Sequence, residues 1–226
     1  MGIGEGILIL EAETMEALLS LSRKFDFRDA VERTAGAVLL AAAAPAIAAA
    51  GATVLLLSGK SPFIAHLRVG EGGRLFWMWK MRTMWPQESA DRGGAAWVEY
   101  IIAEPSGDQK DPRDQRVTSR FAKFLRRHSI DEMPQLWHVA NGEMAFVGPR
   151  PLTRTEIEQH YGAKAREVLS VKPGLTGLWQ TRGRNAVRFP ERAAMDLELV
   201  NGLTAWSYVS ILLRTVTALI HGRGAW

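Results

Sequence analysis

The chain has 226 residues, of which 47% are hydrophobic and 23% are charged, so it is long enough to bury the core of one sizeable domain. Its formal net charge of +4 suits an anionic partner such as a phosphate, a nucleotide or an anionic lipid. The absence of cysteine excludes disulfide bonds, thiol catalysis and cysteine-ligated metal sites.

Residues 1–27 are predicted to form an amphipathic arm in front of the main domain. Leu8, Met15 and Leu18 recur at helical spacing, with acidic side chains among them. The arm carries no obvious chemistry, and we expect it to lie on the protein or on a membrane surface.

The run 34–59 is uncharged, rich in Ala, Leu and Val, and long enough for a membrane helix. Pro45, near its middle, removes a helix hydrogen bond and imposes a kink. Basic residues flank both ends of the run, so the charges give no orientation for a span. We therefore predict a re-entrant helix, broken at Pro45, that enters and leaves the membrane on one face. A buried, Ala-rich core helix is the alternative.

Apolar alternation on either side of the glycine-rich segment 70–73 predicts a β-hairpin. Lys80 and Arg82 would share one strand face, where two cations suit a phosphate. Such a pair is more often a solvated strand face. Residues 86–116 are predicted to form a long loop or lid with one short apolar run at 95–103.

The stretch 126–137 sets two arginines before two adjacent carboxylates, Asp131 and Glu132. Nearby positive charge favours ionised carboxylates, which can serve as nucleophile, metal ligand or helix cap. Ser129 and Glu132 match a capping box. Pro134 fits better if Asp131 is the N-cap, because the proline then lies at the third helical position, where its missing N–H is not needed.

Arg150 lies between Pro149 and Pro151, which stiffen the backbone around it. A planar guanidinium on so stiff a backbone loses little entropy on binding a phosphate. A purely structural turn is the alternative. The later segment 172–180, which ends at Gln180, either closes over a ligand or simply turns.

Residues 190–201 and 203–220 are predicted to form two further helices, the second with an apolar face suited to a membrane interface or to the core. The predicted fold is a helix-dominated α+β domain over residues 28–226. It combines the re-entrant helix with a compact body that holds a small β-hairpin or sheet and amphipathic interface helices.

Four motifs, in order and at plausible spacing, resemble the bacterial sugar transferase family, the monotopic polyprenyl-phosphate phosphoglycosyl transferases. The motifs are Lys80-Met81-Arg82-Thr83-Met84, the stretch from Leu125 to Trp137, Val147-Gly148-Pro149-Arg150-Pro151, and Pro173-Gly174-Leu175-Thr176-Gly177. The resemblance runs from about residue 28 to the C-terminus, and the length resembles the minimal form of the family.

The resemblance implies transfer of a sugar 1-phosphate from a UDP-sugar to polyprenyl (undecaprenyl) phosphate, with release of UMP, as the first membrane step of exopolysaccharide or glycoconjugate assembly. Asp131 would be the nucleophile that forms an aspartyl-phosphosugar intermediate. Glu132 would assist it and hold Mg²⁺. The residues implied to bind phosphate or nucleotide are Lys80, Arg82, Arg126, Arg150, Pro151, Gln180 and Asp196.

The resemblance also implies a monotopic protein on the cytoplasmic face of the bacterial inner membrane, in contact with lipids; a homodimer is left open. A nucleic-acid-binding domain fits poorly, because the cations come in separated motifs and the apolar run has no role there. The alternative function is a catalytically silent membrane-associated scaffold of a glycan assembly complex.

The chain departs from the family pattern at several positions. They are Ala44 for a usual Ser, His66 for Gln, His138 for Asn, Glu143 for Asp and Ala145 for Ser. None of these changes removes the Asp131–Glu132 pair. The sugar itself is not specified, because the motifs address phosphate and nucleotide rather than the glycan ring.

Overall fold

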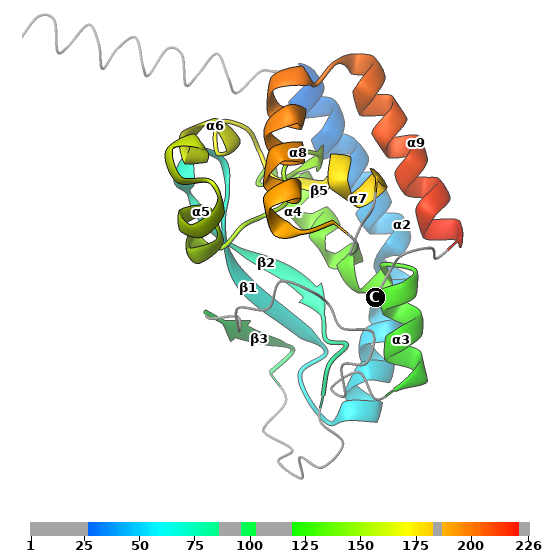
Figure 1. The fold of residues 1–226 in the computed structure, drawn as a ribbon. Coiled ribbons are helices and arrows are strands. Elements are labelled where there is room, and N and C mark those ends of the chain that lie inside the picture. The colour runs from blue at the N-terminus through cyan, green and yellow to red at the C-terminus, as the bar shows by residue number, and fades with distance from the viewer. Residues whose placement is uncertain (1–26, 86–95, 103–118, 183–186, 222–226) are drawn as a thin grey trace, which may run out of the picture.

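The computed structural model describes residues 27–85, 96–102, 119–182 and 187–221. The predicted N-terminal arm, apart from Phe27, and most of the predicted 86–116 loop lie outside these residues. Within the described part, helices dominate and two small sheets complete an α+β fold (Figure 1). The helix-dominated α+β prediction is therefore confirmed.

Helix α2 (Phe27–Ser58) is one continuous helix that contains Pro45, so the predicted break into two helices is not seen. The proline removes one backbone hydrogen bond, and the flanking turns continue the helix on either side. Within the described residues, α2 is the one helix long and apolar enough to cross a membrane. Its most apolar 18-residue stretch has a mean hydropathy of 2.1 and is only 17% buried.

One face of α2 packs against the rest of the protein. The buried residues of this face are Glu32, Gly36, Ala50, Gly51 and Val54. A Cβ at Gly36 would lie 2.9 Å from the Ala140 nitrogen, so the small residue permits the close approach of α4 (Leu136–Asn141). Near the other end of α2, Gly51 lies against Phe63 and Pro62.

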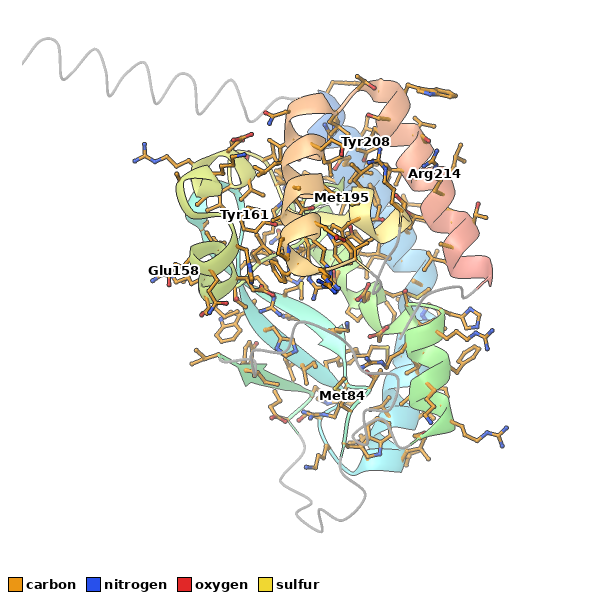
Figure 2. All side chains as sticks on the ribbon, viewed as in Figure 1. Met84, Glu158, Tyr161, Met195, Tyr208 and Arg214 are labelled. Carbon is orange, nitrogen blue, oxygen red and sulfur yellow. The ribbon has the colours of Figure 1, made fainter. Side chains whose placement is uncertain are left out.

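The start of α2 is fixed by a buried carboxylate, Glu32. Its Oε1 accepts hydrogen bonds from Arg28 Nε at 2.7 Å and from the Tyr208 hydroxyl at 2.9 Å. Its Oε2 accepts the Phe146 N–H at 3.2 Å. Tyr208 belongs to α9 (Ala205–His221) and lies toward α2 (Figure 2). Both ends of α2 are therefore attached to the same folded body.

The predicted hairpin is confirmed as strands β1 (Phe63–Val69) and β2 (Leu75–Met81), antiparallel with Ala65 opposite Trp79. They are joined by η1 (Glu71–Gly73), in which Gly72 and Gly73 take left-handed φ values of 66° and 81°. Strand β3 (Val98–Ile101) falls in the predicted short apolar run and pairs parallel to β1. The order β2-β1-β3 leaves β2 at an edge.

The second half of the chain builds the remaining layers. In order, its elements are α3 (Arg120–Arg127), η2 (Ile130–Gln135), α4, β4 (Ala145–Val147), α5 (Arg154–His160), η3 (Gly162–Lys164), α6 (Ala165–Val168), β5 (Gly174–Thr176), α7 (Leu178–Arg182), α8 (Phe189–Gly202) and α9. The two predicted C-terminal helices are confirmed as α8 and α9. In Figure 1 they lie at the opposite end of the molecule from the three-stranded sheet, with α4 between.

Strands β4 and β5 pair in parallel, and Gly148, directly after β4, lies against Gly174 at the start of β5. A Cβ at Gly174 would lie 2.1 Å from the Gly148 nitrogen, a distance that no side chain can occupy. The Gly174 N–H donates to the Pro149 carbonyl at 2.7 Å. This contact holds the segment that leads into Arg150 against the start of β5.

Candidate active site

The turn that carries Asp131 and Glu132 begins with Ser129 in the left-handed region, at φ 52° and ψ 26°. Among the described residues, Ser129 is the one non-glycine with positive φ. Helix η2 begins at Ile130, and the Ser129 side chain makes no capping bond. The prediction of Asp131 as N-cap is therefore wrong, because it assumed an α-helix whereas the chain enters a tighter 3₁₀ turn that contains Pro134.

Asp131 and Glu132 meet Lys80, which reaches them from β2. The Lys80 Nζ lies 3.2 Å from Asp131 Oδ2 and 3.0 Å from Glu132 Oε1. Asp131 is only 2% exposed, whereas the Glu132 side chain is 34% exposed. Among the described residues, Asp131 Oδ2 has an ionic neighbour but no hydrogen-bond partner. One carboxylate is therefore buried and the other faces outward.

The protonation of Lys80 follows from these neighbours. Burial alone would lower the pKa of Lys80, and Arg150 acts in the same direction. The charges of Asp131 and Glu132, with the Glu132 hydrogen bond, outweigh both effects and raise the pKa above its usual value. Lys80 therefore stays an ammonium ion at neutral pH.

The other two cations near this turn lie in different surroundings. Strand β2 ends before Arg82, whose Nε donates to the Ser61 carbonyl at 2.8 Å and whose guanidinium pairs with Glu99 of β3. Arg82 thus does not join Lys80 at the carboxylates. Arg126 is buried at the end of α3, with Nη1 3.5 Å from the Thr83 hydroxyl.

A second polar cluster surrounds Arg150. Asp196 of α8, only 1% exposed, accepts a hydrogen bond from the Tyr161 hydroxyl at 2.9 Å. Figure 2 shows Tyr161 between the α5–α6 region and α8. The Arg150 and Arg192 guanidinium carbons lie 5.7 and 4.7 Å from the centre of the Trp179 ring. These are cation–π distances, so Trp179 helps to place both arginines.

Asp196 is a buried carboxyl with a strongly perturbed pKa. Burial raises the pKa of Asp196 to about 7, although the Tyr161 hydrogen bond and the Arg150 and Arg192 charges lower it in part. Asp196 therefore titrates near neutral pH, beside an arginine that also acts on Lys80. Arg150 is the residue that connects the two clusters.

The remaining predicted site residues lie close to this second cluster in the chain. Pro151 is buried directly after Arg150. Gln180 follows Trp179 on α7, and its buried Oε1 has no hydrogen-bond partner within the described part of the chain. Sequence reasoning missed Tyr161, Trp179 and Arg192. Only Trp179 carried a signal, because it lies next to Gln180 after the glycine-rich motif.

The described residues contain no cluster of three or more His, Asp or Glu side chains that would cage a metal ion. At the first cluster, the oxygens that could ligate a metal and that face outward are those of the Glu132 carboxylate, beside Asp131. This set suits Mg²⁺, which is usually held by one or two carboxylates together with waters and substrate phosphates.

A cavity of about 330 Å³ lies elsewhere, between the start of α2, β4 and α8. Four of its five charged lining residues pair with one another, Arg28 with Glu32 and Lys172 with Asp29, and the fifth is Glu71. The candidate catalytic and phosphate-binding residues therefore lie at the two polar clusters rather than in this cavity.

Comparison with known proteins identifies relatives over most of the chain. The model of the bacterial sugar transferase family matches residues 23–222. The chain is 37% identical over 169 residues to the UDP-galactose-lipid carrier transferase of Erwinia amylovora, a match that covers 74% of this chain and 35% of that protein. It therefore spans about a third of that relative's length.

Two shorter relatives align over more of their own length. The chain is 36% identical over 181 residues to the exopolysaccharide production protein ExoY of Rhizobium meliloti, covering 77% of each chain. It is 34% identical over 194 residues to the UDP-glucose:undecaprenyl-phosphate glucose-1-phosphate transferase of Caulobacter vibrioides, covering 82% of this chain and 67% of that protein. Since every described residue falls inside the span that the family model matches, the chain belongs to the bacterial sugar transferase family.

Proposed function

We propose that this protein transfers a sugar 1-phosphate from a UDP-sugar to undecaprenyl phosphate and releases UMP, as the first membrane step of exopolysaccharide or glycoconjugate assembly. The names of the relatives support the reaction class. The observation that carries the proposal is Asp131: a buried carboxylate 3.2 Å from an ammonium ion, with one oxygen that no hydrogen bond occupies among the described residues. Such an oxygen keeps its lone pairs available for attack on phosphorus.

The reaction would proceed in two displacements at one phosphorus atom. An Asp131 oxygen attacks the phosphorus that bears the sugar, and the bond from this phosphorus to the bridging oxygen breaks, so that UMP leaves with both bonding electrons. A phosphate oxygen of undecaprenyl phosphate then attacks the aspartyl-phosphosugar. The Asp131 carboxylate is released, and the sugar ends on a lipid diphosphate.

Lys80 and Arg150 would supply the positive charge that this chemistry needs. Lys80 offsets the charges of Asp131 and Glu132, which would otherwise repel an anionic diphosphate. Arg150 is partly exposed and lies within electrostatic range of Lys80, which supports a role in binding the substrate phosphates. Catalysis of this kind rests on positioning and charge, which fits the fixed backbone around Arg150.

Glu132 would hold Mg²⁺ through its outward-facing carboxylate. When bound, the ion would offset negative charge on the diphosphate and its leaving oxygen. The partial exposure of Glu132 leaves room for the waters and phosphate oxygens that complete a magnesium shell.

The other predicted site residues divide by their surroundings. Arg126 and Gln180 remain candidates for contact with phosphate or nucleotide, and Pro151 would act by fixing Arg150. Asp196 accepts the Tyr161 hydroxyl and lies beside Arg150, so we propose that it acts on the substrate through Arg150 rather than directly. Arg82 is engaged by Ser61 and Glu99, which supports a role in holding the end of β2.

We further propose that α2 inserts into the cytoplasmic face of the bacterial inner membrane with both ends on the same side. A spanning helix would carry its ends to opposite sides, whereas both ends of α2 pack against one body. Exposed apolar residues on α2 and α9 would face the lipid. They are Val38, Leu39, Leu56, Leu57, Trp206, Val209, Leu213 and Val216.

The path of α2 is tested by labelling. Because the chain has no cysteine, Ala30→Cys and Lys60→Cys each introduce a single thiol. We expect an impermeant maleimide to label both variants from the cytoplasmic side of oriented membrane vesicles. Labelling from opposite sides would exclude a path that keeps both ends of α2 on one side.

The reaction is tested by UMP release from a panel of UDP-sugars with Mg²⁺ and undecaprenyl phosphate. We expect Asp131→Asn to abolish release and Glu158→Gln, a change at an exposed residue of α5, to leave it unaltered. Undiminished release by D131N would refute the nucleophile assignment. No release by the wild-type protein from any sugar in the panel would favour the silent scaffold.

A further inference from the structure

His138 accepts a backbone hydrogen bond from β2, an edge strand of the three-stranded sheet. Strand β2 lies at the edge of its sheet, so its outward N–H groups have no neighbouring strand to accept them. The Trp79 N–H donates instead to His138 Nε2 at 3.0 Å. An edge amide that pairs with a buried imidazole keeps the strand from fraying at that point.

Glu143 fixes which imidazole nitrogen carries the proton. His138 Nδ1 lies 2.7 Å from Glu143 Oε2. Because Nε2 accepts the Trp79 N–H, the hydrogen must be on Nδ1, and the neutral ring satisfies both partners at once. Burial lowers the pKa of His138, although the Glu143 hydrogen bond and charge oppose this shift. The ring is therefore neutral at the pH of the cytoplasm.

The Trp79–His138 hydrogen bond lies next to the residues that carry Lys80 and the two carboxylates. Trp79 directly precedes Lys80 on β2, and α4, which carries His138, continues directly from η2. The bond thus joins the strand that supplies the ammonium group to the helix that continues from the two carboxylates. It acts at the place where the separation between Lys80 and Asp131 is set.

We infer that His138, held by Glu143, is a positioning residue that sets Lys80 against Asp131 and Glu132. This inference rests on the proposed function. His138 does not contact these residues itself and acts through the Trp79 backbone. A shift of about 1 Å in a catalytic group can cost roughly a hundredfold in rate.

Other groups that face His138 do not replace Glu143. The rings of Phe76 and Trp79 pack against the imidazole from β2, with centroids 5.4 and 6.3 Å away. The charged groups on the packed elements have their own partners: Lys80 of β2 pairs with the two carboxylates, and Arg33 and Glu32 of α2 pair with Asp29 and Arg28.

The inference predicts an acid limit on activity. A second proton on His138 makes both nitrogens donors, so the Trp79 N–H loses its acceptor and Lys80 is no longer held. We expect kcat of the wild-type protein to fall as His138 is protonated. Removal of Glu143 lowers the pKa of His138 further and should move this fall to lower pH.

Three variants test the inference. His138→Gln keeps a carbonyl acceptor but cannot be protonated, His138→Phe removes the acceptor, and Glu143→Ala removes the carboxylate that orients the ring. Each is assayed for UMP release across the pH range, with hydrogen exchange of the Trp79 amide measured alongside. Because H138F can fail to fold, H138Q and E143A carry the test if it does.

We expect H138F to lose roughly tenfold to a hundredfold in kcat at about pH 8, with little change in KM. H138Q should retain activity and lack the His138-dependent acid fall, and E143A should show that fall at lower pH. The Trp79 amide should exchange faster in H138F than in H138Q.

An active wild-type protein whose acid fall is unchanged in H138Q and E143A would overturn the positioning role alone. Full activity of a folded H138F would do the same. A wild-type protein that released no UMP would overturn the proposed function, and the positioning role with it.

Discussion

Replacement of Lys80 by Met is the sharpest test of the carboxylate pair. Met keeps an unbranched side chain of similar length but removes the ammonium group that lies 3.2 Å from Asp131 and 3.0 Å from Glu132. The change leaves Asp131, only 2% exposed, without the cation that lies beside it.

The magnitude follows from the burial of each partner. Loss of one member of a buried ion pair typically costs about 3–5 kcal/mol, because the other charge is left stranded. The Glu132 pair is one-third exposed and adds little, since solvent screens it. We therefore expect about 3 kcal/mol of destabilisation, which corresponds to a fall in Tm of about 6–12 °C for a chain of this size.

The assay is thermal unfolding of the protein in nanodiscs, with Lys123→Met as the matched control. Lys123 is exposed on α3, so K123M should melt within about 2 °C of the wild-type protein. If the cost of K80M comes from a stranded Asp131, adding D131N should recover much of it. K80M with a wild-type Tm, or a double variant no more stable than K80M, would refute this account of the site.

Two further changes probe the supporting structure. Asp196→Asn should alter the pH dependence of stability: the folded pKa of about 7 exceeds the unfolded 3.8, so the contribution of neutral Asp196 is complete at about pH 4 and is lost as the pH rises through 7. This loss amounts to at most about 4 kcal/mol. In denaturant unfolding, the stability of D196N relative to the wild-type protein should therefore rise between about pH 4 and 8. A stability difference that stays constant with pH would contradict the burial of a charge at Asp196. Gly36→Ala should destabilise by about 1–3 kcal/mol because its Cβ meets Ala140, whereas Gly202→Ala, with nothing within 4 Å, should be nearly neutral; equal melting temperatures would show that α2 is not tightly seated.

Local patterns predicted most of the fold that is described. Apolar alternation around the glycines at 70–73 identified the hairpin, and helical periodicity identified α8 and α9. The long apolar run was also recognised, but its continuity through Pro45 was not. A proline costs a helix one hydrogen bond, and whether the helix continues depends on packing along its whole length, which the run itself does not encode.

Only those site residues that stand out within a single sequence motif could be predicted. The adjacent Asp131 and Glu132 and the stiff Arg150 were visible in the sequence. The partners that complete them were not: Tyr161 meets Asp196 across 35 positions, and His138 meets Trp79 across 59. The wrong N-cap has a local origin, because the left-handed Ser129 begins the turn two residues earlier than the proline rule predicts.

The attachment of Glu32 has a consequence for the order in which the molecule is made. Its Tyr208 partner lies 176 positions later in the chain, so the ribosome delivers the apolar helix long before the residue that anchors its start. Contacts separated so widely in sequence form late. Because α2 emerges before that partner is made, its apolar side chains can be buried from water in the lipid bilayer. We expect membrane insertion to precede assembly of the body, with closure of the Glu32–Tyr208 contact among the last steps of folding.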